Sequence, residues 1–368
     1  MHATLPRCLL SMLLAAGAAS AATVTHSIGI VGPAGESTIA YDVNAAGQVA
    51  AVLEDEDGKQ RGVLFERGKI TELGSLGGAF SNTKAINASG AIVGSAQEKA
   101  GHWRAFLYQA GVGMRDLGTL GGPSSYGMAI NRAAETAGFA DTADGAFHAF
   151  LHSGGKMRDL GTLGGTISYA SGLNNAGQVV GTADTAAGYR HAFVHAAGKG
   201  MQDLGTLGGR QSSASAINDA GTVVGASEMP DRRWHAFVTE RGRMVDLGAL
   251  IGYGSSYATA INSAGHVVGT VLIGDERQSF VWRDGKMSVH RGGHSLYLTN
   301  AINDGEQVIG ATYSRKLDAA TMSSGAVPVV ARGGKELLAL IGLVIALAGA
   351  AVVHRRRYHG VVLRSFAG

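Results

Sequence analysis

The sequence repeats itself every 41 to 44 residues, and this period constrains the fold more than any other feature. A triplet that ends in asparagine recurs at Asn44, Asn87, Asn131, Asn174, Asn218, Asn262 and Asn303. An acid followed by Leu-Gly recurs at Glu72, Asp116, Asp159, Asp203 and Asp246. A third signature, His-Ala-Phe or a variant of it, is centred on Val63, Phe106, Phe150, Phe193, Phe237 and Phe280. The three signatures advance in the same phase, and a period of this length is typical of propeller blades, solenoid turns or repeat arrays.

Each unit contains four short strand-like segments. In the turn 218–221, Asn218 can cap a type I turn and Gly221 takes a positive φ, which closes a hairpin. A second hairpin passes through Gly155 and Lys156 or their equivalents. The pair Val179-Val180 is apolar on successive positions, which predicts a strand buried on both faces. Two hairpins in each unit predict a four-stranded sheet.

Composition supports short strands and tight turns. Glycine accounts for 57 of 368 residues, and aromatic residues make up only 6%. Helical repeats are excluded, because the units lack a 3.6-residue apolar period and are rich in glycine and β-branched residues. We therefore predict an all-β repeat protein, a β-propeller of about seven four-stranded blades, with a right-handed β-solenoid as the alternative.

The seventh copy lacks a clear His-Ala-Phe strand. Either its outer strand is degenerate and lies near Met322, or a strand around 28–31 from the N-terminal end closes the ring by pairing with the last blade.

The two ends of the chain predict export and anchoring. Arg7, an apolar run and the Ala-Ser-Ala sequence at 19–21 are typical of a secretory signal peptide, residues 1–21, cleaved before Ala22. The only cysteine, Cys8, lies within it, so the mature protein has no disulfide. Residues 22–330 form the predicted ectodomain. Residues 331–368 hold a predicted transmembrane helix (337–353), with a buried C-terminal helix as the alternative, and a basic cytoplasmic tail that begins with three arginines after His354.

The repeats resemble a known family. Arg190-His191-Ala192-Phe193, Asp159-Leu160-Gly161 and Ala216-Ile217-Asn218 are similar to motifs of the bacterial extracellular HAF-repeat family, over residues 26–313. The resemblance implies a secreted, surface-displayed repeat protein, without a particular activity. The C-terminal region, with Val327-Pro328, an apolar stretch and an arginine cluster, resembles a PEP-CTERM sorting signal. Val329-Val330 replaces the family's Glu-Pro, so cleavage by a sorting enzyme and permanent anchoring both remain open.

Catalytic residues are not expected. His148, His191 and His235 recur in step with the repeated aspartates, and a pair present in several units indicates a structural hydrogen bond. Sequence analysis therefore predicts no enzyme, no catalytic residue and no cofactor. A charge of +3, from 31 basic and 28 acidic residues spread along the chain, gives no sign of a nucleic-acid partner.

The candidate binding residues lie in the loops after the Val-Val-Gly strands, which differ between units. The acids are Glu54, Asp141, Asp184 and Glu228, and the aromatic residues are Trp103 and Trp234. Because equivalent loops of a propeller share one rim, these side chains predict a site for an extracellular polysaccharide or surface protein, or for Ca²⁺; solvent-exposed loops and packed aromatics are the simpler interpretation. We expect a non-enzymatic binding or scaffold module, with a propeller-type enzyme acting on surface glycans or a purely structural envelope protein as alternatives.

Overall fold

The computed structural model describes residues 23–27, 37–252, 254–274, 276–290, 298–313 and 317–324. Within these ranges the chain forms β-strands and one short 3₁₀ helix, η1 (Gly248–Leu250). The strands form seven four-stranded sheets, numbered here as blades 1 to 7.

The strands of each blade are given in spatial order. Blade 1 contains β2 (Ser37–Val43), β3 (Val49–Glu54), β4 (Gln60–Glu66) and β5 (Lys69–Glu72). Blade 2 contains β6 (Gly77–Ile86), β7 (Ile92–Glu98), β8 (Trp103–Gln109) and β9 (Gly113–Asp116). Blade 3 contains β10 (Gly121–Ile130), β11 (Thr136–Thr142), β12 (Phe147–Ser153) and β13 (Lys156–Asp159). Blade 4 contains β14 (Gly164–Leu173), β15 (Val179–Thr185), β16 (Arg190–Ala196) and β17 (Gly200–Asp203). Blade 5 contains β18 (Ser212–Ile217), β19 (Val223–Glu228), β20 (Trp234–Glu240) and β21 (Arg243–Asp246). Blade 6 contains β22 (Ser255–Ile261), β23 (Val267–Ile273), β24 (Glu276–Arg283) and β25 (Lys286–His290). Blade 7 contains β26 (Leu298–Ile302), β27 (Val308–Tyr313), β28 (Leu317–Ser324) and β1 (Thr23–Ser27).

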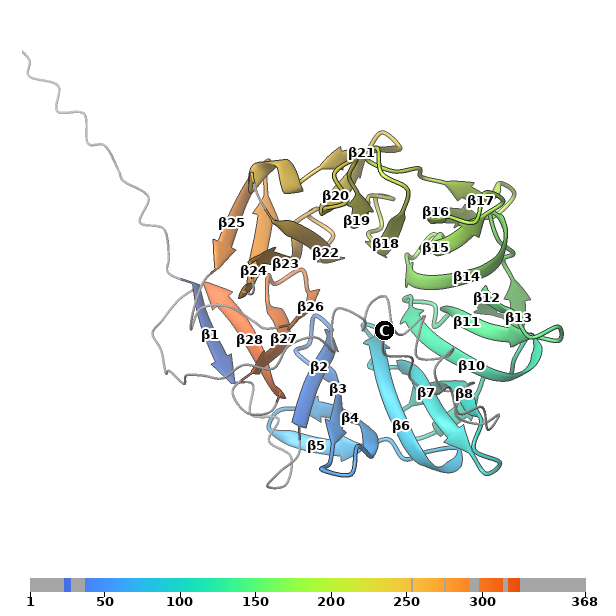
Figure 1. Ribbon diagram of the computed structural model, residues 1–368. Helices are drawn as coiled ribbons and strands as arrows, with labels where there is room; N and C mark the ends of the chain where they lie inside the picture. Colours follow the sequence, from blue (N-terminus) through green and yellow to red (C-terminus); the bar gives the residue numbers. More distant parts are fainter. Residues whose placement is uncertain are drawn as a thin grey trace, which may run out of the picture.

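The blades stand around a common axis, with the first strand of each nearest to it (Figure 1). The predicted all-β propeller is confirmed, and the solenoid alternative is excluded by the closed ring. The Val179-Val180 strand is the second of its blade and both valines are fully buried, as the apolar run predicted.

The two ends of the chain meet in blade 7. The prediction of a degenerate strand near Met322 is confirmed: β28 contains Met322, takes the third place of its sheet, where other blades have the His-Ala-Phe strand, and pairs with both β27 and β1. The second prediction holds as well, because a strand from the N-terminal end closes the ring. That strand is β1, Thr23–Ser27, and the predicted segment 28–31 lies outside the described residues.

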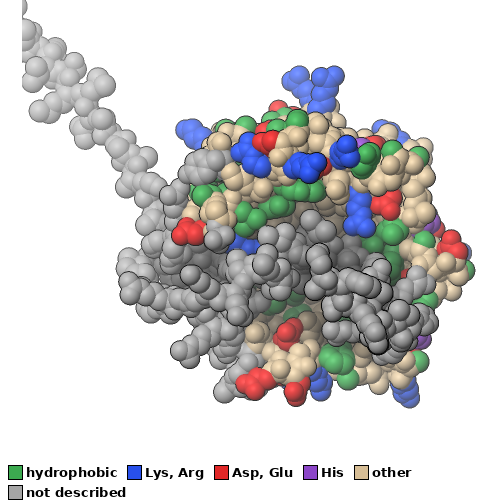
Figure 2. Space-filling view, viewed as in Figure 1, with side chains coloured by type: hydrophobic (Ala, Val, Ile, Leu, Met, Phe, Trp, Pro, Cys, Tyr) green, Lys and Arg blue, Asp and Glu red, His purple; other side chains and the backbone are tan. Residues whose placement is uncertain are grey.

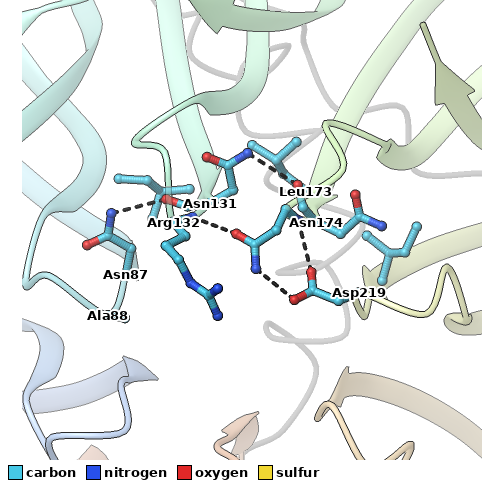
Figure 3. A pocket seen from close by; sticks show the side chains of 10 residues that line it. Asn87, Ala88, Asn131, Arg132, Leu173, Asn174 and Asp219 are labelled. Carbon is cyan, nitrogen blue, oxygen red and sulfur yellow. Dashed lines mark hydrogen bonds between the residues drawn. The ribbon is translucent and has the colours of Figure 1, made fainter.

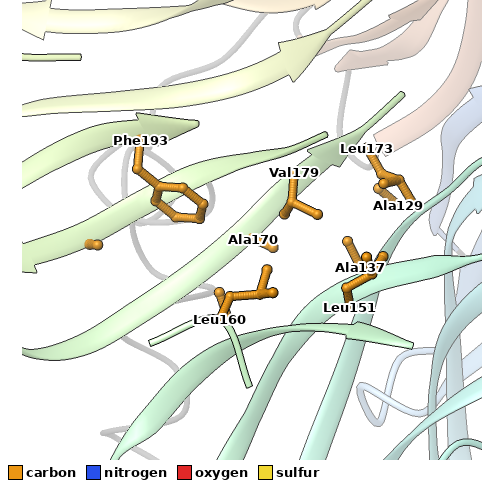
Figure 4. Close-up of a cluster of buried hydrophobic side chains, with 10 residues drawn as sticks. Ala129, Ala137, Leu151, Leu160, Ala170, Leu173, Val179 and Phe193 are labelled. Atoms are coloured by element: carbon orange, nitrogen blue, oxygen red, sulfur yellow. The ribbon is translucent and has the colours of Figure 1, made fainter. Parts of the chain in front are cut away.

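The hydrophobic core lies between neighbouring blades. One cluster contains Leu151 and Leu160 of blade 3 and its link together with Val179 and Phe193 of blade 4 (Figure 4). In each central blade the phenylalanine of the third strand is paired in register with the glycine of the second, as in Gly138 with Phe150. A Cβ atom on Gly138 would lie 1.9 Å from the carbonyl oxygen of Tyr126 and 3.0 Å from the Phe150 ring. Only glycine fits there, and the ring covers it.

A repeated set of hydrogen bonds joins each blade to the next. The Ala149 amide donates to Ser168 Oγ at 2.8 Å, and the Ala149 carbonyl accepts from the Leu160 amide at 2.9 Å. Ser168 Oγ donates in turn to the Gly161 carbonyl at 2.5 Å. The alanine of the His-Ala-Phe signature, the leucine of the Asp-Leu-Gly signature and the serine of the next first strand therefore form one contact, which explains why the signatures recur in a fixed phase.

No helix long and apolar enough to cross a membrane occurs within the described ranges. The predicted signal peptide, the predicted transmembrane segment at 337–353 and the basic tail all lie outside those ranges.

Candidate ligand-binding face

The antiparallel blades give the ring two different faces. Turns after the first and third strands open on one side, which we call the Asn face because it carries the repeated asparagines. Connections after the second strand, and from the fourth strand to the next blade, open on the other side, which we call the loop face. The predicted binding residues Glu54, Asp141, Asp184 and Glu228 all lie at or near the ends of second strands, and therefore at the loop face.

On the Asn face the seven repeated asparagines form a closed ring of hydrogen bonds. Each side-chain amide donates to the backbone carbonyl of the asparagine in the next blade, over 3.1–3.4 Å. Asn303 of blade 7 donates to Asn44 of blade 1 and completes the circle. The Oδ1 atom of each asparagine caps its own turn; Asn174 Oδ1, for example, accepts from the amides of Ala176 and Gln178. These buried side chains hold the inner ends of the blades together.

A second, partial set of polar contacts joins the residues that directly follow the ring asparagines (Figure 3). The Arg132 amide donates to Asn175 Oδ1 at 2.8 Å, and Asn175 Nδ2 donates to Asp219 Oδ2 at 2.7 Å. The cavity at this point measures about 190 Å³. This volume lies below the roughly 300–1,000 Å³ of ordinary small-molecule sites, so the arrangement is better suited to bracing the turns.

Two of the four predicted acids accept a backbone hydrogen bond from the chain in or just before the first strand of their own blade. Asp141 is buried, and its Oδ2 accepts from the Ser124 amide at 3.2 Å. Its charge adds to the effect of burial in raising the pKa of Tyr126. Glu228 Oε2 accepts from the Arg210 amide at 2.8 Å. Both carboxylates stabilise the chain where it enters the first strand.

The other two acids pair with the first residue of the next strand. Glu54 accepts from Gln60 Nε2 at 2.7 Å, and Asp184 lies 3.3 Å from Arg190 Nε. The four acids are therefore each held within their own blade. Among the residues that the structure describes, no group of three or more His, Cys, Asp or Glu side chains could hold a metal ion.

The predicted aromatic residues pack across blade boundaries. Trp103 of blade 2 stacks on Tyr126 of blade 3, with ring centroids 6.4 Å apart, and Trp234 of blade 5 stacks in the same way on Tyr257 of blade 6 at 6.3 Å. Both indoles are partly exposed, and the geometry accounts for them as packing between blades.

The histidine–aspartate pairs are repeated within single blades. His148 lies 2.8 Å from Asp159, and His191 lies 2.8 Å from Asp203, each across the third and fourth strands. Asp159 also accepts from the Gly161 amide at 2.7 Å, which fixes the start of the link to the next blade. The same arrangement recurs at His235 and Asp246, so these pairs brace the outer strands.

One groove on the loop face was missed by the sequence analysis. It lies between blades 4 and 5 and is lined by Tyr189, Arg210, Glu228, Pro230 and Arg232, among others. Basic side chains are most frequent along the upper edge of the molecule, where blade 5 lies in the same view (Figure 2). The sequence does contain a signal for this groove, which is a departure from the repeat. Tyrosine occurs at the position of Tyr189, and arginine at the position of Arg210, in one unit only.

No family model matches this sequence, and neither does any curated protein. Among the solved structures that share the fold are three propeller-containing enzymes or enzyme domains. The propeller domain of the trilobed protease from Pyrococcus furiosus, described as having an open velcro topology, is 10% identical with a TM-score of 0.56, over 78% of this chain and 95% of that one. A puromycin-hydrolysing peptidase from Mycobacterium tuberculosis is 13% identical with a TM-score of 0.53, over 83% of this chain and 54% of that one. An acylaminoacyl peptidase from Pyrococcus horikoshii is 12% identical with a TM-score of 0.51, over 77% and 50%.

These likenesses correct the expectation that the chain is not an enzyme. That expectation rested on the repetition of the histidine–aspartate pairs in several units, whereas the same fold occurs in a protease and in two peptidases. The chain spans about half the length of each peptidase, and at this level of identity the likeness shows the fold alone.

Proposed function

We propose that this chain is an exported propeller that binds an extracellular polymer, a polysaccharide or a surface protein, on its loop face and takes part in the processing of that polymer. The observation that carries the proposal is the difference between the two faces. Polar groups of the Asn face are bonded from blade to blade in a repeated pattern. On the loop face, the loops after the second strands instead carry side chains that differ between blades, including the exposed ring of Tyr189.

A propeller-type enzyme that acts on surface glycans or proteins is the second candidate. It is supported by the protease and peptidase structures that share the fold. Binding and catalysis are separated by one experiment with the purified full chain and labelled polymers. Retention of a polymer on the immobilised chain supports the first proposal, and release of shortened products supports the second. If no extracellular polysaccharide or surface protein is retained or cleaved, both fail.

The export and anchoring proposals have their own test. With residues 337–353 present, the protein should fractionate with membranes and resist salt washing, and deletion after Pro328 should release it. The intact mass of the mature protein distinguishes cleavage near Val327-Pro328 from retention of the arginine cluster. Recovery of the intact chain in the soluble fraction would contradict the anchor.

A further inference from the structure

The groove between blades 4 and 5 is an open site on the loop face. One wall is Tyr189 from the loop of blade 4, the floor is the link 208–211 into blade 5, and the other wall is Glu228 to Pro230 with Arg232. The groove encloses about 600 Å³, within the usual range for ligand sites.

This groove differs from the equivalent junctions because the first strand of blade 5 starts late. β10 and β14 are ten residues long and begin at Gly121 and Gly164, the first glycine of a Gly-Gly pair. The equivalent pair in blade 5 is Gly208-Gly209, but β18 begins only at Ser212 and has six residues. The backbone ahead of β18 is still hydrogen-bonded to the last residue of β19: the Gly209 amide donates to the Glu228 carbonyl at 3.0 Å, and the Glu228 amide donates to the Gln211 carbonyl at 2.8 Å. No peptide can therefore add as a strand through these groups.

The side chains of the groove combine an aromatic face with two guanidinium groups. Tyr189 is 39% exposed, and the Arg210 guanidinium carbon lies 5.4 Å from its ring centroid. Neighbouring Arg190 and Arg233 are paired with Asp184 and Asp231. In the described part of the chain, by contrast, no carboxylate lies within ion-pair distance of the Arg210 or Arg232 side chain.

Arg232 holds a backbone conformation that the other loops give to glycine. Its φ is +66°, while Gly58, Gly101, Gly145 and Gly188 occupy the equivalent position of blades 1 to 4 at +77° to +89°. A residue with a Cβ atom is strained in this region, and such strain is concentrated at functional sites. Blade 5 therefore places a cation at the groove at a cost in conformational energy.

We propose that this groove binds an acidic polysaccharide whose sugar rings carry carboxylates. The Arg210 and Arg232 guanidinium groups donate to the carboxylates, and the exposed ring of Tyr189 packs against a sugar face. Glu228 lies beside them and can accept from sugar hydroxyls. The inference deepens the proposed function and rests on it, since it names the class of polymer and the part of the loop face that binds it.

The test compares two arginine-to-glycine variants of the full chain. Arg232→Gly restores the glycine of the other blades at the groove. Arg241→Gly makes the same change at another arginine of blade 5 whose backbone is in the left-handed region, with a φ of +50°. Arg241 lies in a turn of the Asn face. Binding of polygalacturonate fragments is measured by calorimetry and stability by thermal unfolding. We expect both variants to melt at higher temperature than the parent. Arg232→Gly should weaken binding roughly tenfold, as expected for a charged hydrogen bond, and Arg241→Gly should leave the affinity unchanged.

Each other outcome overturns the inference in a distinguishable way. Equal binding of dextran, a neutral glycan, would show that the carboxylates are not recognised. Equal binding of polyglutamate would show that the groove accepts an acidic peptide instead. Binding of polygalacturonate that both variants retain would place the site elsewhere. If polygalacturonate does not bind but another extracellular polymer does, this inference fails and the proposed function stands, whereas the absence of binding to all of them rejects both.

Discussion

The Asn face and the loop face use the same repeat in opposite ways. On the Asn face, seven asparagines make the same contact with the next blade, and the last closes the circle on the first. On the loop face, the residues at equivalent positions differ: Tyr189 and Arg210 meet between blades 4 and 5, where Ala146 and Thr166 stand one junction earlier. The repeated residues therefore form the contacts that build the ring, and the residues that depart from the repeat are the candidates for ligand binding.

Ring closure adds a second contrast. Six blades are formed by consecutive strands, whereas blade 7 takes β1 from the N-terminal end beside β28. The Pyrococcus furiosus propeller domain with the same general fold is described as having an open velcro topology. In this chain the last blade cannot be completed without the residues that directly follow the predicted signal peptide.

The largest expected effect concerns the repeated core. Phe193 is fully buried between blades, so Phe193→Ala should lower the free energy of unfolding by about 3–5 kcal/mol through lost burial and an unfilled cavity. Tyr189→Ala removes an exposed aromatic from the loop face and should change it by less than about 0.5 kcal/mol. Urea unfolding of both variants checks the contrast, and equal losses would contradict it.

The asparagine ring should show the next largest effect. Asn174→Ala removes the donor to the Asn218 carbonyl and the cap of its own turn, leaving buried groups without partners. We expect a loss of about 2 kcal/mol in the free energy of unfolding. Asn175→Ala, at the adjacent exposed asparagine, is the matched control and should cost less than about 1 kcal/mol, because water can replace the bonds of its side chain to Asp219 and to the Arg132 amide. If the asparagine ring did not stabilise the contact between blades, both substitutions would lower the free energy of unfolding by the same small amount.

The predicted acids should differ in how much each contributes to the free energy of unfolding, although they hold equivalent positions on the loop face. Asp141→Asn affects a buried carboxylate that accepts a backbone hydrogen bond and should cost about 1 kcal/mol. Glu54→Gln affects a half-buried carboxylate paired with a neutral glutamine and should cost little. The binding prediction for all four acids is tested by replacing them together with amides: retained polymer binding would contradict their role in the site.

Much of the fold could be predicted from the sequence because each blade makes the same local choices. The turn after Asn218 and the fully buried Val179-Val180 strand both followed from local residue types. What could not be predicted depends on contacts between blades. The asparagine ring joins residues 41–44 positions apart and finally 259 apart, and periodicity alone does not show which atoms meet. The groove could not be predicted for the opposite reason. Tyr189 and Arg210 each occur at their position of the repeat in one unit only, so the repeated pattern does not include them.

The smallest expected effect is a pH dependence of the folding stability, caused by two histidines at equivalent positions of blades 3 and 4. Burial lowers the pKa of both His152 and His195 from the usual 6.5, and the charges of Arg115 and Arg158 in the preceding blades lower the two values further. Because the unfolded chain then binds more protons than the folded one, stability should be fully present above about pH 6.5 and should decrease as the pH falls below it. Asp42 acts in the opposite sense, because burial raises the pKa of its carboxyl to about 6 and folding is favoured as that group takes up a proton. The measurement is therefore best made in an Asp42→Asn background, comparing the midpoint of urea unfolding between pH 7.5 and pH 5. Replacing both histidines with glutamine should flatten that decrease, and an unchanged slope would show that the two imidazoles are protonated as readily in the folded ring as in the unfolded chain.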